Sequence, residues 1–487
     1  MFRGSFQRIA RTGLAGVALL AAVGLPMKDA LAVPAFARQT GQNCVACHAG
    51  GQFPELTPYG RIFKLTGYTL GTRGLPLSVM AVATYTKTKN TDTTPNGGTP
   101  ATDFVRDGSP IFNTASLFLA GKITDNIGGF AQFTFNNYDD VSADGTHFRG
   151  HSSSDNFDVR YADRFIDTSR DLIFGFTLNN NPSVQDVWNS APAWGFNVVP
   201  GSSGPATLPI LAGGLAQQVA GLGAYVYWNK TLYAELAGYQ TADGVFSFMS
   251  QGINSERGSQ NLIKGVNPYF RLALTKEWGP HNVMVGTSGF LVDQYPDPFG
   301  LGANGPTNRV RDFGLDAQYQ YLLDPHSITA TVAYIREKTH YADGLGGQAG
   351  AVDASAGSSA QAPTNSDDTL NMFRAKVSYV YKAKYGGTLS YFNVTGSTNS
   401  ANQTAAFDPA SGSVLTNGTT GPGLNATGNP GTTGWTTEVF WTPIQNARVG
   451  VQYTMFSKFN GASDNYDGFG RNARDNNTVF VYVWGAY

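Results

Sequence analysis

The residues with the clearest chemistry are the only two cysteines of the 487-residue chain, which lie three positions apart in Cys44-Val45-Ala46-Cys47-His48. Two thiols at this spacing can bond the two vinyl groups of one haem, and the adjacent imidazole is placed to ligate the iron. A disulfide or a redox dithiol is the alternative in an exported protein. The histidine and the lack of a thioredoxin-like βαβ pattern favour haem. The motif predicts one covalent c-type haem, attached to Cys44 and Cys47, with His48 as the proximal iron ligand.

A short helix should follow this motif. Thr57 can cap its N-terminus, Pro58 suits its first position and Gly67 suits the C′ position. These three signals predict a helix over residues 58–66.

Two faces of the predicted helix differ in chemistry. Tyr59, Ile62 and Phe63 share one face and can pack on the porphyrin. Arg61 and Lys64 lie on another face and are candidates for contact with the haem propionates, with plain solvated charges as the alternative. The haem is the only redox centre predicted, and no separate catalytic residue is expected.

The N-terminus is typical of an export signal. Three arginines among the first eleven residues precede an apolar core at 14–25 and a small-residue cleavage site at 30–32. We expect residues 1–32 to be the signal peptide and Val33 to begin the mature protein, with Arg38 as a second candidate start. A retained anchor is the alternative, although the apolar core is too short to span a bilayer.

Composition excludes several classes of protein. Charged residues make up 14% and aromatic residues 13% of the chain, and short apolar segments are separated by Gly, Thr, Ser, Asn and Asp. This mixture is typical of an all-β protein rich in turns and not of a disordered chain. A net charge of -1 gives no reason to expect nucleic acid as a partner.

The predicted haem segment, residues 33–74, is too small to form a core of its own even with covalent haem. It contains no methionine and no histidine besides His48, so the sixth iron ligand has to come from elsewhere. Met80 is the first candidate and Met284 the second, because both share parity with small polar residues that should face inward. Packing is the usual role of methionine. His340 or an open, water-bound position are the other options.

From residue 75 onward the chain is predicted to form a porin-like outer-membrane barrel. Segments of about ten residues alternate between apolar and polar side chains, which is the transmembrane barrel pattern with apolar residues outside. Apolar residues alternate in this way in the segments 130–136, 222–228, 270–274 and 313–321. The charged residues of the opposite parity, expected to face the lumen, are Asp158, Arg160, Glu235, Arg271, Asp312, Asp316, Arg374, Lys376, Glu438 and Arg448.

The connections predict the number of strands. Seven tight turns alternate with eight long loops, which gives sixteen antiparallel strands with both termini on the short-turn side. The last strand, 478–487, ends on an aromatic residue, as the last strand of other outer-membrane proteins does. The predicted loops are 89–110, 138–154, 180–218, 243–264, 294–309, 342–369, 399–432 and 460–475. A barrel of this size has room for more than its own side chains, so we expect the haem segment to plug the lumen.

Several motifs resemble the fused outer-membrane cytochrome–porin family of iron-oxidising bacteria. The resemblance covers the mature chain in its length and in its order of plug and barrel. The motifs that carry it are Ala-Arg-Gln-Thr-Gly at 37–41, Phe-Pro at 53–54, Gly-Arg-Ile-Phe-Lys at 60–64 with Gly-Tyr at 67–68, Asn-Asn-Asn-Pro-Ser-Val-Gln-Asp at 179–186 with Trp188, and Ala-Trp-Gly-Phe at 193–196.

The resemblance implies an electron conduit in the outer membrane. Such a protein takes electrons from ferrous iron at the extracellular face and passes them to a periplasmic cytochrome or copper protein, as an iron:cytochrome c oxidoreductase. The long loops would be extracellular and the termini periplasmic. A haem-plugged porin, or a conduit for another extracellular donor or acceptor, is the alternative. The protein would be a monomer or a trimer.

Ferrous iron would favour carboxylate ligands at the surface. The predicted loops offer three aspartate pairs, Asp139 with Asp140, Asp367 with Asp368 and Asp464 with Asp467. Polar loops of any barrel contain such pairs, and an outer-sphere donor needs no iron site.

Overall fold

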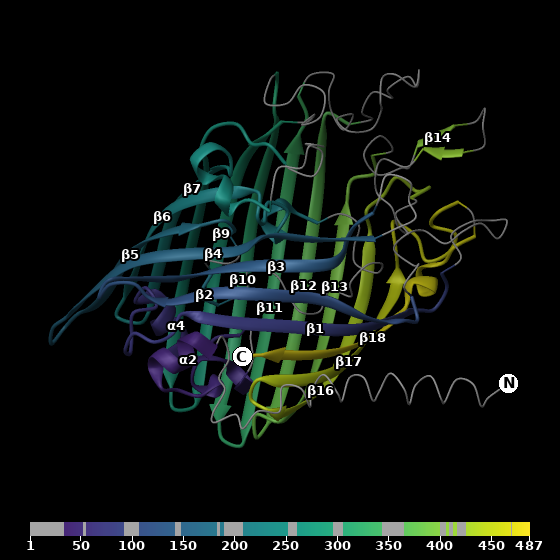
Figure 1. Cartoon of the computed structure of the whole chain (residues 1–487). Helices are drawn as coiled ribbons and strands as arrows, with labels where there is room; N and C mark the ends of the chain where they lie inside the picture. Colours follow the sequence, from purple (N-terminus) through teal and green to yellow (C-terminus); the bar gives the residue numbers. More distant parts are fainter. Residues whose placement is uncertain are drawn as a thin grey trace, which may run out of the picture.

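A computed structural model describes residues 34–51, 55–91, 107–141, 148–182, 186–188, 208–251, 261–295, 305–342, 365–399, 406–408, 413–415, 425–468 and 470–487. The predicted signal peptide, 1–32, and most of the long loops lie outside these ranges. In the described part of the chain, sixteen strands close into one barrel in which every pairing is antiparallel. The predicted fold class and strand number are therefore confirmed (Figure 1).

Neighbouring strands in the barrel follow chain order, and β1 pairs with β18 to close it. A separate two-stranded sheet, β14 (Ala406–Asp408) and β15 (Ser413–Leu415), lies in the predicted loop 399–432. The barrel strands are β1 (Leu77–Thr88), β2 (Pro110–Lys122), β3 (Ile127–Val141), β4 (Phe148–Ile166), β5 (Asp171–Asn179), β6 (Val219–Trp228), β7 (Leu232–Thr241), β8 (Asn267–Trp278), β9 (His281–Gln294), β10 (Asn308–Leu323), β11 (His326–His340), β12 (Asp367–Tyr381), β13 (Tyr385–Gly396), β16 (Thr432–Ile444), β17 (Ala447–Lys458) and β18 (Thr478–Ala486).

The two ends of the barrel differ. Short turns join β2–β3, β4–β5, β6–β7, β8–β9, β10–β11, β12–β13 and β16–β17, and the start of β1 and the end of β18 lie at the same end. We call this the turn end and the opposite one the loop end. One predicted connection was wrong in length, because β3 and β4 extend into the loop expected at 138–154 and leave only 142–147 between them.

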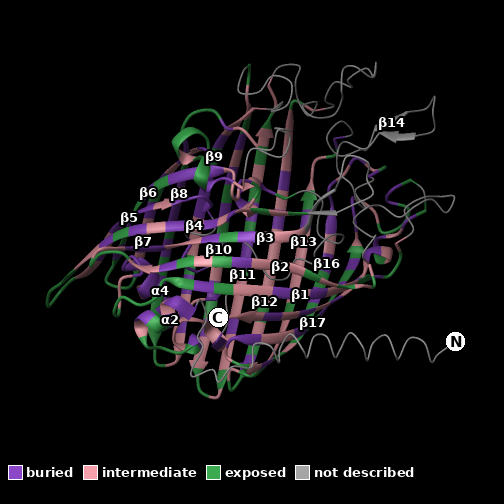
Figure 2. Cartoon of the chain, viewed as in Figure 1, coloured by how far each residue is buried: buried purple, intermediate pink, exposed green. Residues whose placement is uncertain are grey.

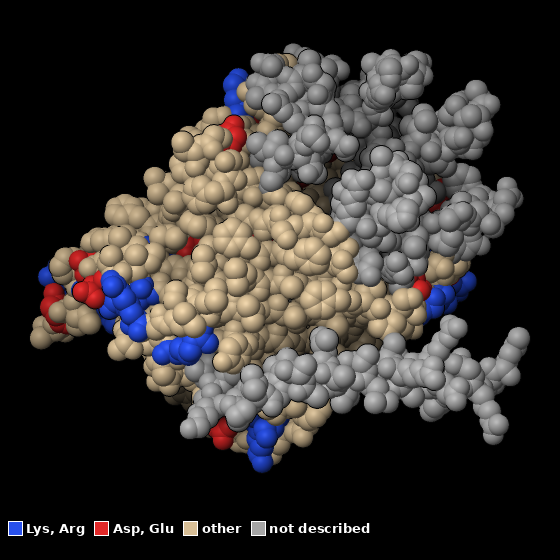
Figure 3. All heavy atoms as spheres, viewed as in Figure 1, with Lys and Arg blue, Asp and Glu red and all other residues tan. Residues whose placement is uncertain are grey.

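The side chains alternate between the two faces of the wall as predicted (Figure 2). In β6, Leu222 and Trp228 are 66% and 49% exposed, whereas Tyr225 and Tyr227 between them are buried. Most of the charged residues expected inside are buried there, among them Asp158 and Arg160, whereas Arg374, Lys376 and Arg448 are half-buried. Charged side chains gather near the ends of the barrel, and the broad wall between them is almost free of them (Figure 3). An apolar band of this kind is the outer-membrane architecture.

Helices precede the first strand. They are α2 (Pro34–Thr40), α3 (Cys44–Cys47), the 3-10 helix η1 (Ala49–Gly51) and α4 (Pro58–Leu65). The predicted helix at 58–66 is thus α4, and Thr57 caps it by accepting from the Gly60 N–H at 3.1 Å. Three further 3-10 helices, η3 (Ile210–Ala212), η4 (Gly244–Met249) and η7 (Ala473–Asn476), lie between strands. No helix in the described ranges has the length and apolar character needed to span a bilayer.

Helix α2 lies against the wall at the turn end. The Ala35 N–H donates to Ser78 Oγ of β1 at 2.8 Å, and Gln39 Oε1 accepts from the Lys122 N–H at the end of β2 at 2.8 Å. The chain then crosses the mouth of the barrel, and α4 enters the lumen, where Tyr225 of β6 donates to the Leu65 carbonyl at 2.8 Å. The N-terminal helices therefore fill part of the barrel, as the plug prediction requires.

Candidate functional site: the Cys44–His48 motif inside the barrel

The two cysteines lie on one helical turn. Helix α3 spans Cys44–Cys47, and the His48 N–H closes the turn on the Cys44 carbonyl at 2.9 Å. The thiols are not joined in a disulfide. Cys44 is buried and its Sγ donates to the carbonyl of Gln445, in the turn between β16 and β17, at 3.5 Å. The Cys44–His48 motif therefore lies at the turn end of the barrel, beside the hairpin that β16 and β17 form.

The electrostatics of the motif do not suit a redox dithiol. Burial, with a smaller contribution from Cys44, raises the pKa of the Cys47 thiol to about 11. A reactive dithiol instead needs a lowered pKa, because the thiolate is its working form. Desolvation lowers the pKa of His48 to about 4, with Glu55 opposing it, so the imidazole is neutral at neutral pH. Neutral imidazole is the form that ligates metals.

Backbone contacts hold the motif against α4. The Ala49 N–H donates to the Glu55 carbonyl at 2.8 Å, and the Thr57 N–H donates to the Cys47 carbonyl at 2.9 Å. A Cβ built on Gly60 would lie 2.1 Å from the Cys47 carbonyl oxygen. Because nothing larger than glycine fits, the first turn of α4 packs directly on the backbone of α3.

Adding one methyl group at this contact should loosen the plug. We expect Gly60→Ala to push α4 away from α3 and to cost about 1–3 kcal/mol of packing free energy, as overpacking does in other cores. Trypsin should then cleave after Arg61 and Lys64, which are buried in the native protein. Gly74→Ala is the matched control, because a Cβ there meets no atom nearer than 3.9 Å. Equal trypsin resistance of the two variants would contradict the prediction.

An ion pair ties the motif to the wall. Glu55, between the motif and α4, bonds the ammonium group of Lys376 on β12. Burial alone would raise the pKa of the Glu55 carboxyl, but Lys376, with help from Arg448, holds it below its usual value. Nearby, a Cβ on Gly50 would lie 2.5 Å from Cγ2 of Val380, so η1 also packs tightly on β12.

The two cations of α4 are engaged by other parts of the barrel interior. Arg61 donates to Asn282 Oδ1 of β9 at 2.9 Å and to Gln320 Oε1 of β10 at 3.2 Å. Lys64 lies 4.0 Å from the Asp158 carboxylate of β4 and donates to the Asp186 carbonyl at 3.3 Å. The wall thus occupies the polar atoms for which sequence analysis expected haem propionates.

The aromatic face expected on α4 is divided among different neighbours. Phe63 meets the rings of Phe36 and Tyr68 at centroid distances of 5.0 and 5.7 Å. Ile62 packs on a buried cluster of the wall, and Tyr59 remains 38% exposed. Tyr59 therefore remains the most accessible of the three for contact with a bound group.

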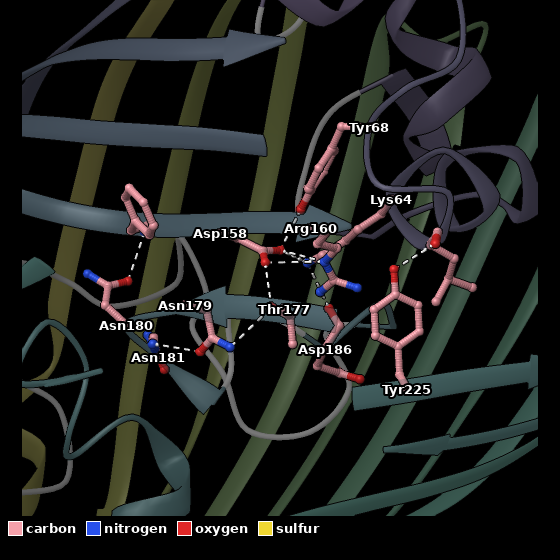
Figure 4. A network of polar contacts seen from close by, with 12 residues as sticks. Lys64, Tyr68, Asp158, Arg160, Thr177, Asn179, Asn180, Asn181, Asp186 and Tyr225 are labelled. Carbon is pink, nitrogen blue, oxygen red and sulfur yellow. Dashed lines mark hydrogen bonds and ion pairs between the residues drawn. The ribbon is translucent and has the colours of Figure 1, made fainter. Parts of the chain in front are cut away.

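A polar network inside the lumen joins the plug to two strands. Tyr68 donates to Asp158 at 2.6 Å, Arg160 pairs with the same carboxylate at 2.9 Å, and Thr177 donates to it at 2.9 Å. Figure 4 shows these side chains converging from the plug, β4 and β5, with Lys64 beside them. Sequence analysis predicted that Asp158 and Arg160 face inward but not that they hold the plug.

The segment Asp186–Trp188 folds into the lumen, which sequence analysis missed. Arg271 lies between two carboxylates, with Nε 3.4 Å from Asp186 Oδ1 and Nη2 2.7 Å from Asp316 Oδ2. Gln318 donates to the Trp188 carbonyl at 2.9 Å. The signal in the sequence was the motif at 179–186 with Trp188, which sequence analysis used only for the family resemblance.

The candidate sixth ligands differ in accessibility. Met284 is 2% exposed and packs in the buried cluster of Leu65 and Trp188, with Sδ 4.0 Å from Arg271 Nη2. Met80 faces inward as predicted and is half-buried beside Trp484. Its register partner Ala486 is bonded to Asn446, the neighbour of Gln445.

Met80 thus lies on the same side and at the same height of the barrel as Cys44, whose thiol contacts Gln445. His340, in contrast, ends β11 at the loop end and bonds Asp367 through Nδ1 at 3.1 Å. Met80 remains the candidate best placed on the wall.

The aspartates considered for ferrous iron do not form a metal site in the described structure. Asp368 accepts from Tyr341 at 2.7 Å, and Asp467 accepts from the Arg471 N–H at 3.0 Å. The side chains of Asp139 and Asp140 lie outside the described part. Where side chains are described, no group of three or more His, Cys, Asp or Glu could hold a metal ion.

Comparison with known proteins finds outer-membrane channels of low sequence identity. The chain is similar to the outer membrane channel DcaP of Acinetobacter baumannii, with a TM-score of 0.45 and 13% identity over 84% of this chain and 96% of that chain. It is also similar to OmpF of Salmonella typhi in complex with daunomycin, with a TM-score of 0.43 and 13% identity over 84% of this chain and 97% of that chain. No family model and no curated protein matches the chain. The barrel assignment therefore rests on the strand pairing of this chain itself.

Proposed function

We propose that this outer-membrane barrel conducts electrons. It takes them from ferrous iron at the extracellular face, uses one c-type haem attached to Cys44 and Cys47, and passes them to a periplasmic cytochrome or copper protein. The observation that carries the proposal is the Cys44–His48 motif, held inside the mouth of a closed barrel with its thiols not joined in a disulfide. Barrels of this class place their termini and short turns in the periplasm, which would put the motif on the side of the soluble carriers.

The residues present suit a c-type haem. The two thiols are not joined in a disulfide and lie on one turn, burial raises the pKa of the Cys47 thiol to about 11, and the His48 imidazole beside them is neutral. Cys44, Cys47 and His48 would therefore hold the group, with Met80 as the candidate for the sixth position. When bound, such a haem would supply a one-electron Fe(III)/Fe(II) couple.

The chain itself contributes position and insulation. The Glu55–Lys376 pair and the Gly60 contact fix the motif against β12 and α4. Helix α4 and the segment Asp186–Trp188 occupy part of the lumen, where they pack on a buried cluster of the wall. With the haem bound beside them, small solutes would be kept from passing while an electron could cross. Burial among low-dielectric protein atoms and fixed charges is what tunes the potential of a buried redox centre.

Ferrous iron is proposed as an outer-sphere donor. The described loops show no cluster of metal ligands, and electron donation from hydrated iron requires none. Each donor ion loses one electron and leaves as ferric iron outside the cell. The reduced carrier gains that electron on the periplasmic side, so no iron has to cross the membrane.

Reduction of the purified holoprotein by ferrous ions in a stopped-flow spectrometer tests the proposal. Haem absorbance should change to the reduced form, with a rate that rises with ferrous concentration. Ferrous iron would be excluded as the electron donor if dithionite reduced the haem and ferrous ions did not. That outcome would leave a conduit for a different extracellular donor or acceptor.

A haem-plugged porin is the second candidate, favoured by the sixteen-stranded barrel itself. The two functions differ in conductance. An electron conduit of this design should show no ion conductance in a planar bilayer, whereas a porin should show open channels. Sustained channel openings by the haem-loaded protein would decide for the porin.

A further inference from the structure

The lumen of the barrel is filled unevenly. Helix α4 leans on β4, β6, β9 and β10, and inward side chains there, such as Arg160 and Gln320, are completely buried. On β1, β12 and β13, inward side chains such as Met80, Arg374 and Phe392 are only half-buried. Some inward side chains of these strands are therefore less covered, on the side of the lumen that also contacts Cys44 and Gly50.

Arg374 on β12 differs from the other inward cations. Arg160, Arg271 and Lys376 each meet a carboxylate. For the Arg374 guanidinium, no hydrogen bond or ion pair is found among the residues that the structure describes, and no charged group acts on it there. A half-buried guanidinium without a charged neighbour favours an anionic partner.

Ser390 supplies a second unsatisfied polar group on the same wall. Its Oγ is buried and makes no hydrogen bond to any described residue. In the register between β12 and β13, Ser390 lies opposite Lys376, and Arg374 lies opposite Phe392. Arg374 and Ser390 are thus diagonal neighbours on the inner face, about 7–8 Å apart at the backbone. One group with two oxygen atoms could reach both side chains.

Strand β12 connects this pair to the haem motif. Val380 contacts Gly50, two residues after His48, and Lys376 bonds Glu55. Arg374 follows two residues farther toward the loop end, a step of about 7 Å along a strand. The pair therefore lies on the inner face of β12 and β13, beyond the contacts of the motif with β12 and toward the loop end.

We infer that Arg374 and Ser390 of the barrel wall bind a propionate of the covalent haem. This inference rests on the function proposed above. A guanidinium and a carboxylate form short, charge-assisted and commonly bidentate hydrogen bonds, and a serine hydroxyl can donate a further one. Arg61, which sequence analysis favoured for this contact, is already bonded to β9 and β10, and Lys64 is bonded to the Asp186 carbonyl. The wall cation, and not the plug, therefore fixes the orientation of the haem.

Spectroelectrochemical titration of the holoprotein at several pH values tests this inference. Loss of the positive charge in Arg374→Gln should disfavour reduction about tenfold, which lowers a one-electron midpoint potential by about 59 mV. The potential should also depend more steeply on pH, since an unpaired propionate titrates more easily. Ser390→Ala should shift the potential less in the same direction, and Arg374→Lys should restore most of the native value.

Arg336→Gln is the matched control, because it removes the same charge from the exposed outer face of β11. Haem content per barrel should be native in every variant. An unchanged potential in both Arg374→Gln and Ser390→Ala, at native haem content, would overturn the inference. A shift of equal size in Arg336→Gln would also overturn it, because net charge would then explain the effect. A wild-type barrel that carries no covalent haem would instead refute the proposed function itself.

Discussion

The double variant Cys44→Ser, Cys47→Ser should assemble as a barrel, retain no haem after denaturation and lose all reduction by ferrous ions. A hydroxyl cannot form the thioether bond that attaches a c-type haem. The barrel should tolerate the change, because its strand pairing involves neither residue and the contact between the Cys44 thiol and the Gln445 carbonyl is long, at 3.5 Å. Haem staining of a denaturing gel measures attachment, and heat-shifted electrophoretic mobility measures barrel folding.

His48→Ala serves as the comparison that separates attachment from ligation. It should keep the covalent haem and change its absorption spectrum, because both thiols remain and the proximal ligand is lost. His281→Ala is the control, since His281 lies at a turn of the barrel and bonds Tyr319 at 2.8 Å. Covalent haem in the double serine variant, or a native spectrum in His48→Ala, would contradict the assignment of these residues.

The second large effect is expected from Arg271→Met, which should destabilise the protein by about 3–5 kcal/mol and open the lumen to ions. Arg271 is completely buried between Asp186 and Asp316, so its removal leaves two buried carboxylates without their cation. Repulsion between them should release the segment Asp186–Trp188 from the wall. That segment also accepts from Lys64, so α4 should loosen with it.

Two measurements test this effect. Urea titration of the detergent-solubilised barrel reports the free energy of unfolding, and planar-bilayer recording reports ion conductance. Arg311→Met is the matched control, because Arg311 pairs with Asp293 at 3.1 Å while both side chains are about 40% exposed. Exposed pairs contribute about 0–1 kcal/mol. An Arg271→Met protein of native stability and without ion conductance would show that Asp186–Trp188 does not close the lumen.

The fold could be predicted from the sequence because apolar, outward-facing residues alternate with inward-facing residues along every strand of a transmembrane barrel. Leu222 and Trp228 face out and Tyr225 faces in, as their parity requires. The strand count followed from the alternation of turns and loops and was correct. The predicted loop between β3 and β4 was too long. Polar residues such as Ser152 and Ser154 belong to β4, where pairing with β3 satisfies the hydrogen bonds of their backbone.

The candidate site could be predicted only in part. The haem motif is local, so five adjacent residues define it. Its supports are not local, since Glu55 and Lys376 are 321 positions apart and Arg61 and Asn282 are 221 apart. Parity predicts that a charged residue faces the lumen but not which partner it meets there.

The same limit explains why sequence analysis assigned the propionate contact to α4. Arg61 and Lys64 are the cations nearest to the motif along the chain, whereas Arg374 comes close only when β12 takes its place in the closed barrel. Which cations are already paired depends on the direction in which α4 leans, and no pattern in the chain encodes that direction by itself.

The burial of Cys44 beneath Gln445 has a consequence for biogenesis. Gln445 belongs to the turn between β16 and β17, which are among the last strands to be synthesised, and its carbonyl contacts the Cys44 thiol. Once that hairpin is in place, an enzyme could no longer reach the thiol. Under the proposed function, haem would therefore have to be attached before the barrel closes, so the cell would complete a cofactor on a chain that is still held unfolded between two membranes.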